Sequence, residues 1–270
     1  MKRLVIVVLA SILSMTVFAE GYQVNLLSTK QTGMGHVGTG MKLGAESMHF
    51  NPAGLVFLRT NMDFSLGISA IMAKAKYSYD GYSAKTDNPV GTPLYAYAGF
   101  KIYDNLAAGI SLTTPYGNSL KWPKNWAGAG LIQDISLKSY VIQPTLSYKI
   151  TDRLSIGVGL QLAWGNVNLS RALMGASDLQ GIGTKFESLL PMLAGVPSSI
   201  IPDEDKKAMQ EMVALMKNTE VPPAYARLEG NAHMRVGFNV GIMYDICDKV
   251  TVGLSYRSKI KMRVKEGEAS

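Results

Sequence analysis

The stretch Met48-His49-Phe50-Asn51-Pro52-Ala53-Gly54-Leu55-Val56-Phe57-Leu58 marks the point where the sequence changes character. Before it lies a glycine-rich segment without helical or strand periodicity, and strictly alternating strands begin directly after it. The apolar residues of this region are Leu26, Leu27, Met41, Leu43, Met48, Phe50, Leu55 and Phe57. They are too many for a flexible exposed tail, which is the alternative interpretation. This order predicts a β-barrel whose own N-terminus, residues 20–61, folds back into the lumen as a plug, or hatch.

From residue 62 onward the sequence alternates with a period of two. The clearest run places Leu154, Ile156, Val158, Leu160, Leu162 and Trp164 on one face, opposed by Ser155, Gly157, Gly159, Gln161 and Ala163. Six further runs cover residues 64–72, 94–102, 106–112, 140–150, 234–246 and 250–264. One apolar face and one small or polar face is typical of a strand between lipid and a barrel lumen. It is also typical of a soluble β-sandwich with its apolar face inward.

The lengths of the connections favour the membrane barrel. Tight turns at residues 104–105, 151–153 and 247–249 alternate with long connections at residues 79–91, 117–133 and 173–230. This alternation is typical of outer-membrane barrels with short periplasmic turns and long outer loops. The sequence therefore predicts an all-β fold, a transmembrane antiparallel β-barrel to which residues 62–270 contribute seven strands. Because bacterial single-chain barrels have an even strand number and no open edges, seven strands cannot close, and we expect the N-terminal portion of a longer chain.

The first residues predict export. Lys2 and Arg3 precede an apolar core, and this first segment ends in a small residue, Ala19. The pattern predicts a signal peptide over residues 1–19. A membrane anchor is the alternative, but the core is too short to span a bilayer comfortably. The net charge of +7 is a weak indication of anionic lipid or nucleic acid. No Lys/Arg cluster is interleaved with aromatic residues, so nucleic acid is not an expected partner.

The longest connection carries two helical patterns. Residues three or four apart form one apolar face: Leu179, Ile182, Phe186, Leu189, Leu190 and Leu193. A second stripe follows Asp203, an expected N-cap, and consists of Met209, Met212, Val213 and Met216. The sequence leaves two alternatives open: the helices pack against each other, or they expose an apolar groove on a helical outer loop, residues 173–230.

The sequence gives no positive sign of an enzyme, metal or cofactor. His36, His49 and His233 are isolated and lack metal-ligand spacing, and no Gly-x-Ser-x-Gly motif occurs. The glycines of residues 33–38 lack the βαβ surroundings of a dinucleotide site. Two alternatives from other classes stay open, a lipase-type barrel with an outward Ser–His pair and a purely structural barrel.

Several short motifs, in order and spacing, resemble the FadL/TodX family of outer-membrane long-chain fatty-acid and hydrocarbon transporters. They are Gly21-Tyr22-Gln23-Val24-Asn25, Asn51-Pro52-Ala53, Tyr116-Gly117, Asn239-Val240-Gly241-Ile242-Met243-Tyr244 and Leu254-Ser255-Tyr256-Arg257-Ser258. The resemblance implies a barrel of about fourteen strands in the outer membrane of a Gram-negative bacterium, so that about half of the barrel strands would be present here. It also implies passive uptake of a hydrophobic small molecule, with outer-membrane lipid as surroundings and a monomer when complete. A long-chain fatty acid is the favoured substrate and an aromatic hydrocarbon the alternative.

The resemblance also assigns gating residues. Asn51, Pro52 and Ala53 would belong to the plug, and Pro115, Tyr116 and Gly117 to an inward kink in strand three through which ligand leaves sideways. Proline removes a ladder donor and glycine tolerates a bulge, so these residue types suit such a kink. An ordinary strand end before a loop is the alternative.

The ligand-binding expectations follow the strand pattern and the family. The lumen face of the fifth strand, continued in register, carries Val167, Leu169 and Arg171. Arg171 matches a family arginine and could pair with a carboxylate, or could be a solvated side chain at the loop base. Further candidates for an outer groove are Phe186, Leu190, Trp122 and Trp126, the tryptophans having an interfacial belt as alternative. On the seventh strand, Arg257, Lys259, Lys261 and Arg263 would share the lumen side.

Overall fold

The computed structural model describes residues 23–173, 176–218 and 225–269. The predicted signal peptide, residues 1–19, lies outside the described residues. Within the described ranges, no helix combines the length and the apolar character that crossing a membrane requires.

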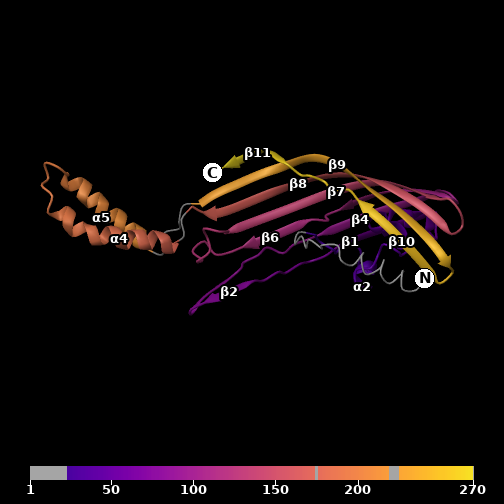
Figure 1. Cartoon of the computed structure of the whole chain (residues 1–270), viewed down its shortest axis with the longest axis horizontal. Coiled ribbons are helices and arrows are strands. Elements are labelled where there is room, and N and C mark those ends of the chain that lie inside the picture. The colour runs from indigo at the N-terminus through magenta and orange to yellow at the C-terminus, as the bar shows by residue number, and fades with distance from the viewer. Residues whose placement is uncertain (1–22, 174–175, 219–224, 270) are drawn as a thin grey trace, which may run out of the picture.

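One curved antiparallel sheet dominates the structure (Figure 1). Its neighbours run in the order β1, β4, β5, β7, β8, β9, β10. Their bounds are β1(Met62–Ile68), β4(Leu94–Tyr103), β5(Leu106–Thr113), β7(Asp134–Lys149), β8(Leu154–Ala172), β9(Tyr225–Cys247) and β10(Val250–Arg257). The tight turns between β4 and β5, β7 and β8, and β9 and β10 lie where they were predicted. The predicted predominance of antiparallel strands is confirmed, and the described sheet is open between β1 and β10.

The apolar face of the strands is the outer, solvent-exposed one. In the apolar runs of β1, β8, β9 and β10 the even-numbered side chains point outward, with Leu66 exposed at 81% and Leu254 at 70%. Odd-numbered polar side chains of β7, such as Gln143 and Ser147, are buried on the concave side. A soluble sandwich would bury the apolar face instead, so the pattern fits strands with a lipid-facing exterior.

Three strands extend beyond their apolar runs. β7 begins at residue 134 and β8 ends at residue 172, as the predicted connections at 117–133 and 173–230 imply, whereas β9 begins at 225 rather than 231. In these extensions Asn166, Asn168 and Glu229 lie on one face, because Asn168 pairs with Glu229, and Val167, Leu169 and Leu228 lie on the other. The alternation of polar and apolar residues therefore continues toward the ends of these strands.

The long connections contain regular structure of their own. The first holds the hairpin β2(Lys76–Tyr79) and β3(Tyr82–Lys85). The prediction of a loop over residues 117–133 is partly wrong, because β6(Gly117–Lys121) pairs with β7. A further strand, β11(Val264–Ala269), pairs with β9 beyond the end of β10.

The helical loop forms an antiparallel helix pair that projects beyond the sheet (Figure 1). α4(Ala176–Ala194) and α5(Asp203–Lys217) pack closely where Gly183 meets Met216, and Lys217 Nζ lies 2.6 Å from Glu187. The alternative in which the helices pack against each other is therefore realised. Asp203 is not the N-cap as expected, because Pro202 occupies that position.

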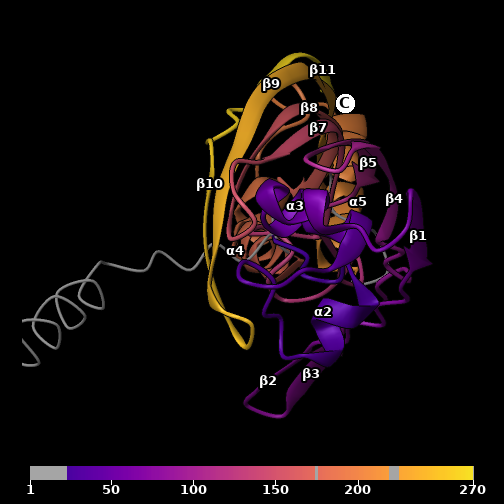
Figure 2. The same cartoon turned by 90° about the vertical axis from the view of Figure 1, so that its right-hand side faces the viewer.

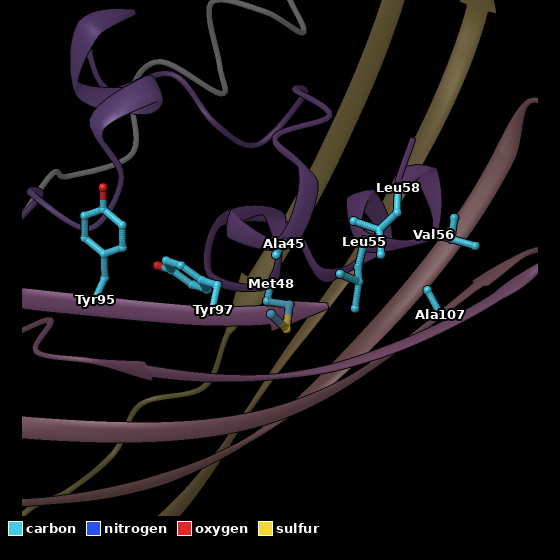
Figure 3. Close-up of a cluster of buried hydrophobic side chains, with 8 residues drawn as sticks. All are labelled: Ala45, Met48, Leu55, Val56, Leu58, Tyr95, Tyr97 and Ala107. Carbon is cyan, nitrogen blue, oxygen red and sulfur yellow. The ribbon is translucent and has the colours of Figure 1, made fainter. Parts of the chain in front are cut away.

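The N-terminal segment lies on the concave side of the sheet. It comprises α2(Thr29–Gly33), η1(Gly44–Glu46), α3(Ser47–Phe50) and η2(Pro52–Phe57). Figure 2 shows α3 enclosed by the curve of the strands. The core between segment and wall consists of Ala45, Met48, Leu55, Val56, Leu58, Tyr95, Tyr97 and Ala107 (Figure 3). Burial of these apolar side chains stabilises the position of the segment against the sheet.

Candidate functional site

The Asn51-Pro52-Ala53 motif is buried in the concave interior and ties the N-terminal segment to itself and to the wall. Asn51 Oδ1 accepts a hydrogen bond of 3.1 Å from the Ala53 amide. Its Nδ2 donates to the carbonyl oxygens of Thr39 at 2.8 Å and Ile242 at 3.1 Å. Asparagine is suited to this position because one side chain satisfies a turn donor and two carbonyl acceptors.

Two serines of neighbouring strands complete the attachment of the motif. Ser147 Oγ of β7 and Ser155 Oγ of β8 both donate to the Ala53 carbonyl oxygen, at 3.1 and 2.9 Å. Gly157 allows this approach, because a Cβ there would lie 2.3 Å from the Pro52 carbonyl carbon. The small and polar residues of the inner face are therefore those that the buried backbone needs.

The wall also satisfies the carbonyl groups of α3. Gln143 Nε2 donates to the Met48 oxygen at 2.6 Å, and Asn239 Nδ2 donates to the His49 oxygen at 3.2 Å. The Arg257 guanidinium donates to the same His49 oxygen. None of the three wall residues was predicted as a site residue. Their inward strand positions were the available signal, since a polar side chain facing a buried segment needs a partner there.

His49 was interpreted as polar filler, but it is buried between the segment and Arg257. Burial lowers the pKa of His49 well below its ordinary value of 6.5, and the Arg257 charge lowers it further. Among residues 23–173, 176–218 and 225–269, no group of three His, Cys, Asp or Glu side chains could hold a metal ion.

The depressed pKa of His49 predicts acid destabilisation. The unfolded chain takes up the proton near pH 6.5 whereas the folded protein does not, so stability is full above that pH and falls as the pH drops below it. We expect the free energy of unfolding of the micelle-bound protein, measured in urea, to decrease as the pH is lowered from 7 to 5. The slope should be at most about 1.4 kcal/mol per pH unit. His49→Gln should reduce that slope. The exposed His36→Asn should leave it unchanged, and equal slopes for His49→Gln and wild type would contradict the assignment.

The third strand of the sheet is interrupted. β5 pairs with β7 as far as Thr113 opposite Val141, and β6 resumes the pairing at Gly117 opposite Lys138. Three residues of this strand therefore face two of β7. Because pairing resumes, the strand does not simply end before a loop, and the irregularity is a bulge in a continuing strand.

The predicted residues Pro115, Tyr116 and Gly117 lie at this interruption. Pro115 offers no amide hydrogen to the ladder. Ser139 of β7 replaces regular pairing: its Oγ accepts from the Tyr116 amide at 3.1 Å and donates to the Tyr116 carbonyl at 2.8 Å. The sequence did not indicate the contribution of Ser139.

A cavity of about 290 Å³ lies at the interruption. It is lined by inward-facing Leu137 and Ser139 of β7 and by outward-facing Lys138 and Tyr140 of the same strand. The cavity therefore lies directly against the irregular part of the third strand. Val24 from the N-terminal segment also lines it.

Residues 23–27, here called the N-terminal arm, cover the interruption. The Val24 amide donates to the Pro115 carbonyl at 2.8 Å, and Gln23 forms an antiparallel bridge with Tyr116. At the other end of the arm, Tyr97 Oη donates to the Leu27 carbonyl at 2.9 Å. The contacts at the break thus come from the arm rather than from Asn51-Pro52-Ala53.

A buried carboxylate secures the segment that follows the arm. Glu46 accepts hydrogen bonds from Ser28 Oγ and from Ser65 Oγ of β1, the latter at 2.5 Å. The Thr29 amide donates to Tyr95 Oη at 3.2 Å. The base of the arm is therefore held by side chains, whereas its tip is held by the two contacts at the break.

The family model described as outer membrane protein transport protein (OMPP1/FadL/TodX) matches residues 10–270. The chain belongs to this family. The long-chain fatty acid transport protein of Salmonella typhi is 25% identical over 269 residues, covering 97% of this chain and 56% of that protein. The Escherichia coli K12 protein of the same name is 23% identical over 269 residues, covering 97% and 57%. The chain spans about half the length of these relatives.

Solved structures share the fold. A Pseudomonas aeruginosa FadL homologue superposes with a TM-score of 0.58 at 18% identity, covering 89% of this chain and 53% of that one. The Pseudomonas putida toluene transporter TodX gives 0.56 at 17% identity, covering 91% and 56%. The monoaromatic hydrocarbon channel CymD gives 0.54 at 19% identity, covering 86% and 52%.

In this FadL/TodX family member, the predicted ligand residues of β8 do not form a closed pocket. Val167 and Leu169 are half-buried, whereas Arg171 is exposed. The neighbours of Arg171, Ser170 and Ala172, are the buried residues at this end of the strand. The expected enclosed guanidinium is therefore open to solvent among the described residues.

The two tryptophans predicted for an outer groove form a buried core instead. Trp122 and Trp126 stack with centroids 4.2 Å apart, and Trp126 Nε1 donates to the Ile132 carbonyl at 2.8 Å. Their cluster contains neither Phe186, which is exposed on α4, nor half-buried Leu190. The structure thus does not gather the four predicted groove residues into one surface.

The expected ladder of four cations on the last strand does not form. Arg257 faces inward, but β10 ends there and Lys259, Lys261 and Arg263 are exposed in the segment that follows. Their alternation was interpreted as continuous strand, whereas the chain leaves the sheet at residue 258. Arg257 alone reaches the buried segment.

Proposed function

We propose that this protein is an outer-membrane channel for passive uptake of hydrophobic molecules, with long-chain fatty acids as the favoured substrate class. Residues 20–61 act as its plug, and ligand leaves sideways through the opening between β5 and β6. The observation that supports the proposal is the cavity at this interruption, which is lined in part by Val24 of the N-terminal arm. An opening in the barrel wall suits a molecule that partitions into lipid, because the transfer of a polar solute into the bilayer is unfavourable.

The arm is the part suited to move. Its tip is held by the Val24–Pro115 hydrogen bond and the Gln23–Tyr116 bridge. Each such bond contributes about 0.5–1.5 kcal/mol net, so ligand contacts of similar strength can displace the tip. The Asn51-Pro52-Ala53 motif makes one internal hydrogen bond and four to the wall and the rest of the segment, and so would give the moving tip a stationary base.

Binding to the full-length, detergent-solubilised protein tests the function. We expect saturable binding of a long-chain fatty acid that a monoaromatic hydrocarbon does not displace. Displacement by the aromatic would favour the hydrocarbon-channel alternative, for which the TodX and CymD folds are the reason. A folded protein that binds neither ligand would contradict both and favour a structural barrel.

Arg171 provides a test of the substrate head group. If its guanidinium pairs with a carboxylate, Arg171→Ala should weaken fatty-acid binding by about tenfold, the effect of a hydrogen bond to a charged group. Binding of the matching long-chain alcohol should change little. Lys207→Ala, which removes a cation from α5, is the matched control. Equal losses for acid and alcohol would contradict a carboxylate role for Arg171.

A further inference from the structure

The last strand of the sheet is interrupted as well. β10 pairs with β9 as far as Arg257 opposite Asn239, and β11 resumes at Val264 opposite Ala232. Six residues separate these pairs on each strand. Residues 258–263, here called the excursion, therefore leave the sheet and return to it in the same register. Figure 1 shows β10 and β11 as separate arrows along β9.

The excursion turns toward the concave interior. Gly237 of β9 faces inward, because Asn239 and Gly241 on the same face contact the buried N-terminal segment. A Cβ on Gly237 would lie 2.5 Å from Ile260 Cγ1, so Ile260 occupies the space that this glycine leaves. Met262 Cε lies 3.1 Å from the Cβ position of Gly165, which is likewise on the inner face.

The excursion lies next to the interruption of the third strand. A small hollow of about 20 Å³ is lined by Ser258 and Ile260 of the excursion and by Pro115 and Tyr116 of the break. Tyr116 also lines the larger cavity of about 290 Å³ at the break. The two irregular segments, far apart in the sequence and on different strands, thus meet on the inner side of the opening.

The hollow between them is too small for a ligand. Its volume is about that of one water-sized probe, so an alkyl chain or an aromatic ring cannot pass unless Ile260 or Tyr116 moves. The excursion can move at low cost, since only Ser258 is tied back to β9, by bonds of 2.9 and 2.8 Å with Phe238. Among the residues that the structure describes, the excursion makes no other backbone hydrogen bond.

We propose that the excursion, through Ile260, is an inner barrier between the lumen and the wall opening, and that the size of residue 260 sets the rate of lateral release. The inference rests on the proposed function. The N-terminal arm and Ile260 would then be two successive layers that a ligand has to pass at the break. An apolar ligand can take the place of the Ile260 side chain at low cost. An ion cannot, because it would lose its hydration among apolar groups.

Variants of Ile260 in the full-length protein test the barrier. Because a gating step can set the transport rate, we expect Ile260→Ala to raise uptake of a radiolabelled long-chain fatty acid by cells about threefold. We expect Ile260→Trp to lower it by a similar factor. Equilibrium binding to the detergent-solubilised protein should stay within about twofold of wild type in both, because the barrier changes a rate rather than an affinity.

Ile246 offers the matched control, since it is exposed on the outer face of β9. Ile246→Ala and Ile246→Trp should transport at the wild-type rate. If Ile260→Ala fails to fold, Ile260→Val removes one methylene group and should give a smaller increase in the same direction. Ile260 variants that fold and transport at the wild-type rate overturn the barrier. A wild-type protein that neither binds nor transports the fatty acid overturns the proposed function instead.

Discussion

A disulfide between the N-terminal arm and the third strand is expected to abolish uptake. Gln23 and Tyr116 are directly bridged in antiparallel fashion. Such pairs have Cα atoms about 4.5–5.5 Å apart, within the range that a disulfide spans. Gln23→Cys together with Tyr116→Cys should therefore cross-link under oxidising conditions and hold the arm over the opening. We expect uptake of a long-chain fatty acid to fall to background in the oxidised protein and to return on reduction.

Two controls make this result specific. The exposed Cys247 is replaced by serine in all variants so that it cannot compete for the new thiols. Each single cysteine variant should transport at the same rate with and without oxidant, because no cross-link forms. A quantitatively cross-linked protein that still transports at the rate of its reduced form would show that the arm need not leave the opening.

Gly157→Ala is expected to displace the N-terminal segment from the wall. The added Cβ would lie 2.3 Å from the Pro52 carbonyl carbon and 2.4 Å from the Ala53 amide nitrogen. Both are backbone atoms fixed by Ser147 and Ser155, so neither can turn aside as a flexible side chain would. Overpacking of this kind costs about 1–3 kcal/mol. We expect a lower urea midpoint and, because the proposed plug no longer seats, ion conductance in planar bilayers.

Gly181→Ala is the matched control for this substitution. Gly181 lies in α4 with no atom near its Cβ position. Alanine there should be neutral, or should stabilise the helix by up to about 1 kcal/mol, and should leave the barrel non-conducting. A Gly157→Ala protein with the wild-type urea midpoint and no conductance would contradict the close seating of Pro52.

The sequence alone determined the faces and turns of the sheet. Alternation from Leu154 to Trp164 identified the outward and inward sides of β8, because strand side chains alternate strictly and only one face meets lipid. The tight turns and the two helices of the longest loop also followed from local residue types, whereas the kink at Pro115 was expected from the family resemblance. The motifs indicated the family, which the family model confirmed over residues 10–270.

Only the tertiary structure decided how far the strands run and what faces the interior. β9 begins to pair with β8 at Tyr225, within the residues 173–230 that were expected to form a helical loop, so the sequence did not indicate this first part of the strand. The roles of Gln143, Asn239 and Arg257 depend on carbonyl groups of Met48 and His49, about 100 to 200 residues away in the chain, a separation over which no local pattern acts.

The surroundings of the two strand interruptions also depend on residues far apart in the chain. The family resemblance indicated the break at Pro115, but not the arm that covers it or the excursion behind it. Alternating Arg257, Lys259, Lys261 and Arg263 has the pattern of a strand, yet the chain leaves the sheet because Gly237 and Gly165 provide space for Ile260 and Met262. Sequence periodicity determines which way a side chain points within a strand. Whether the strand continues depends on the space that its distant neighbours leave open.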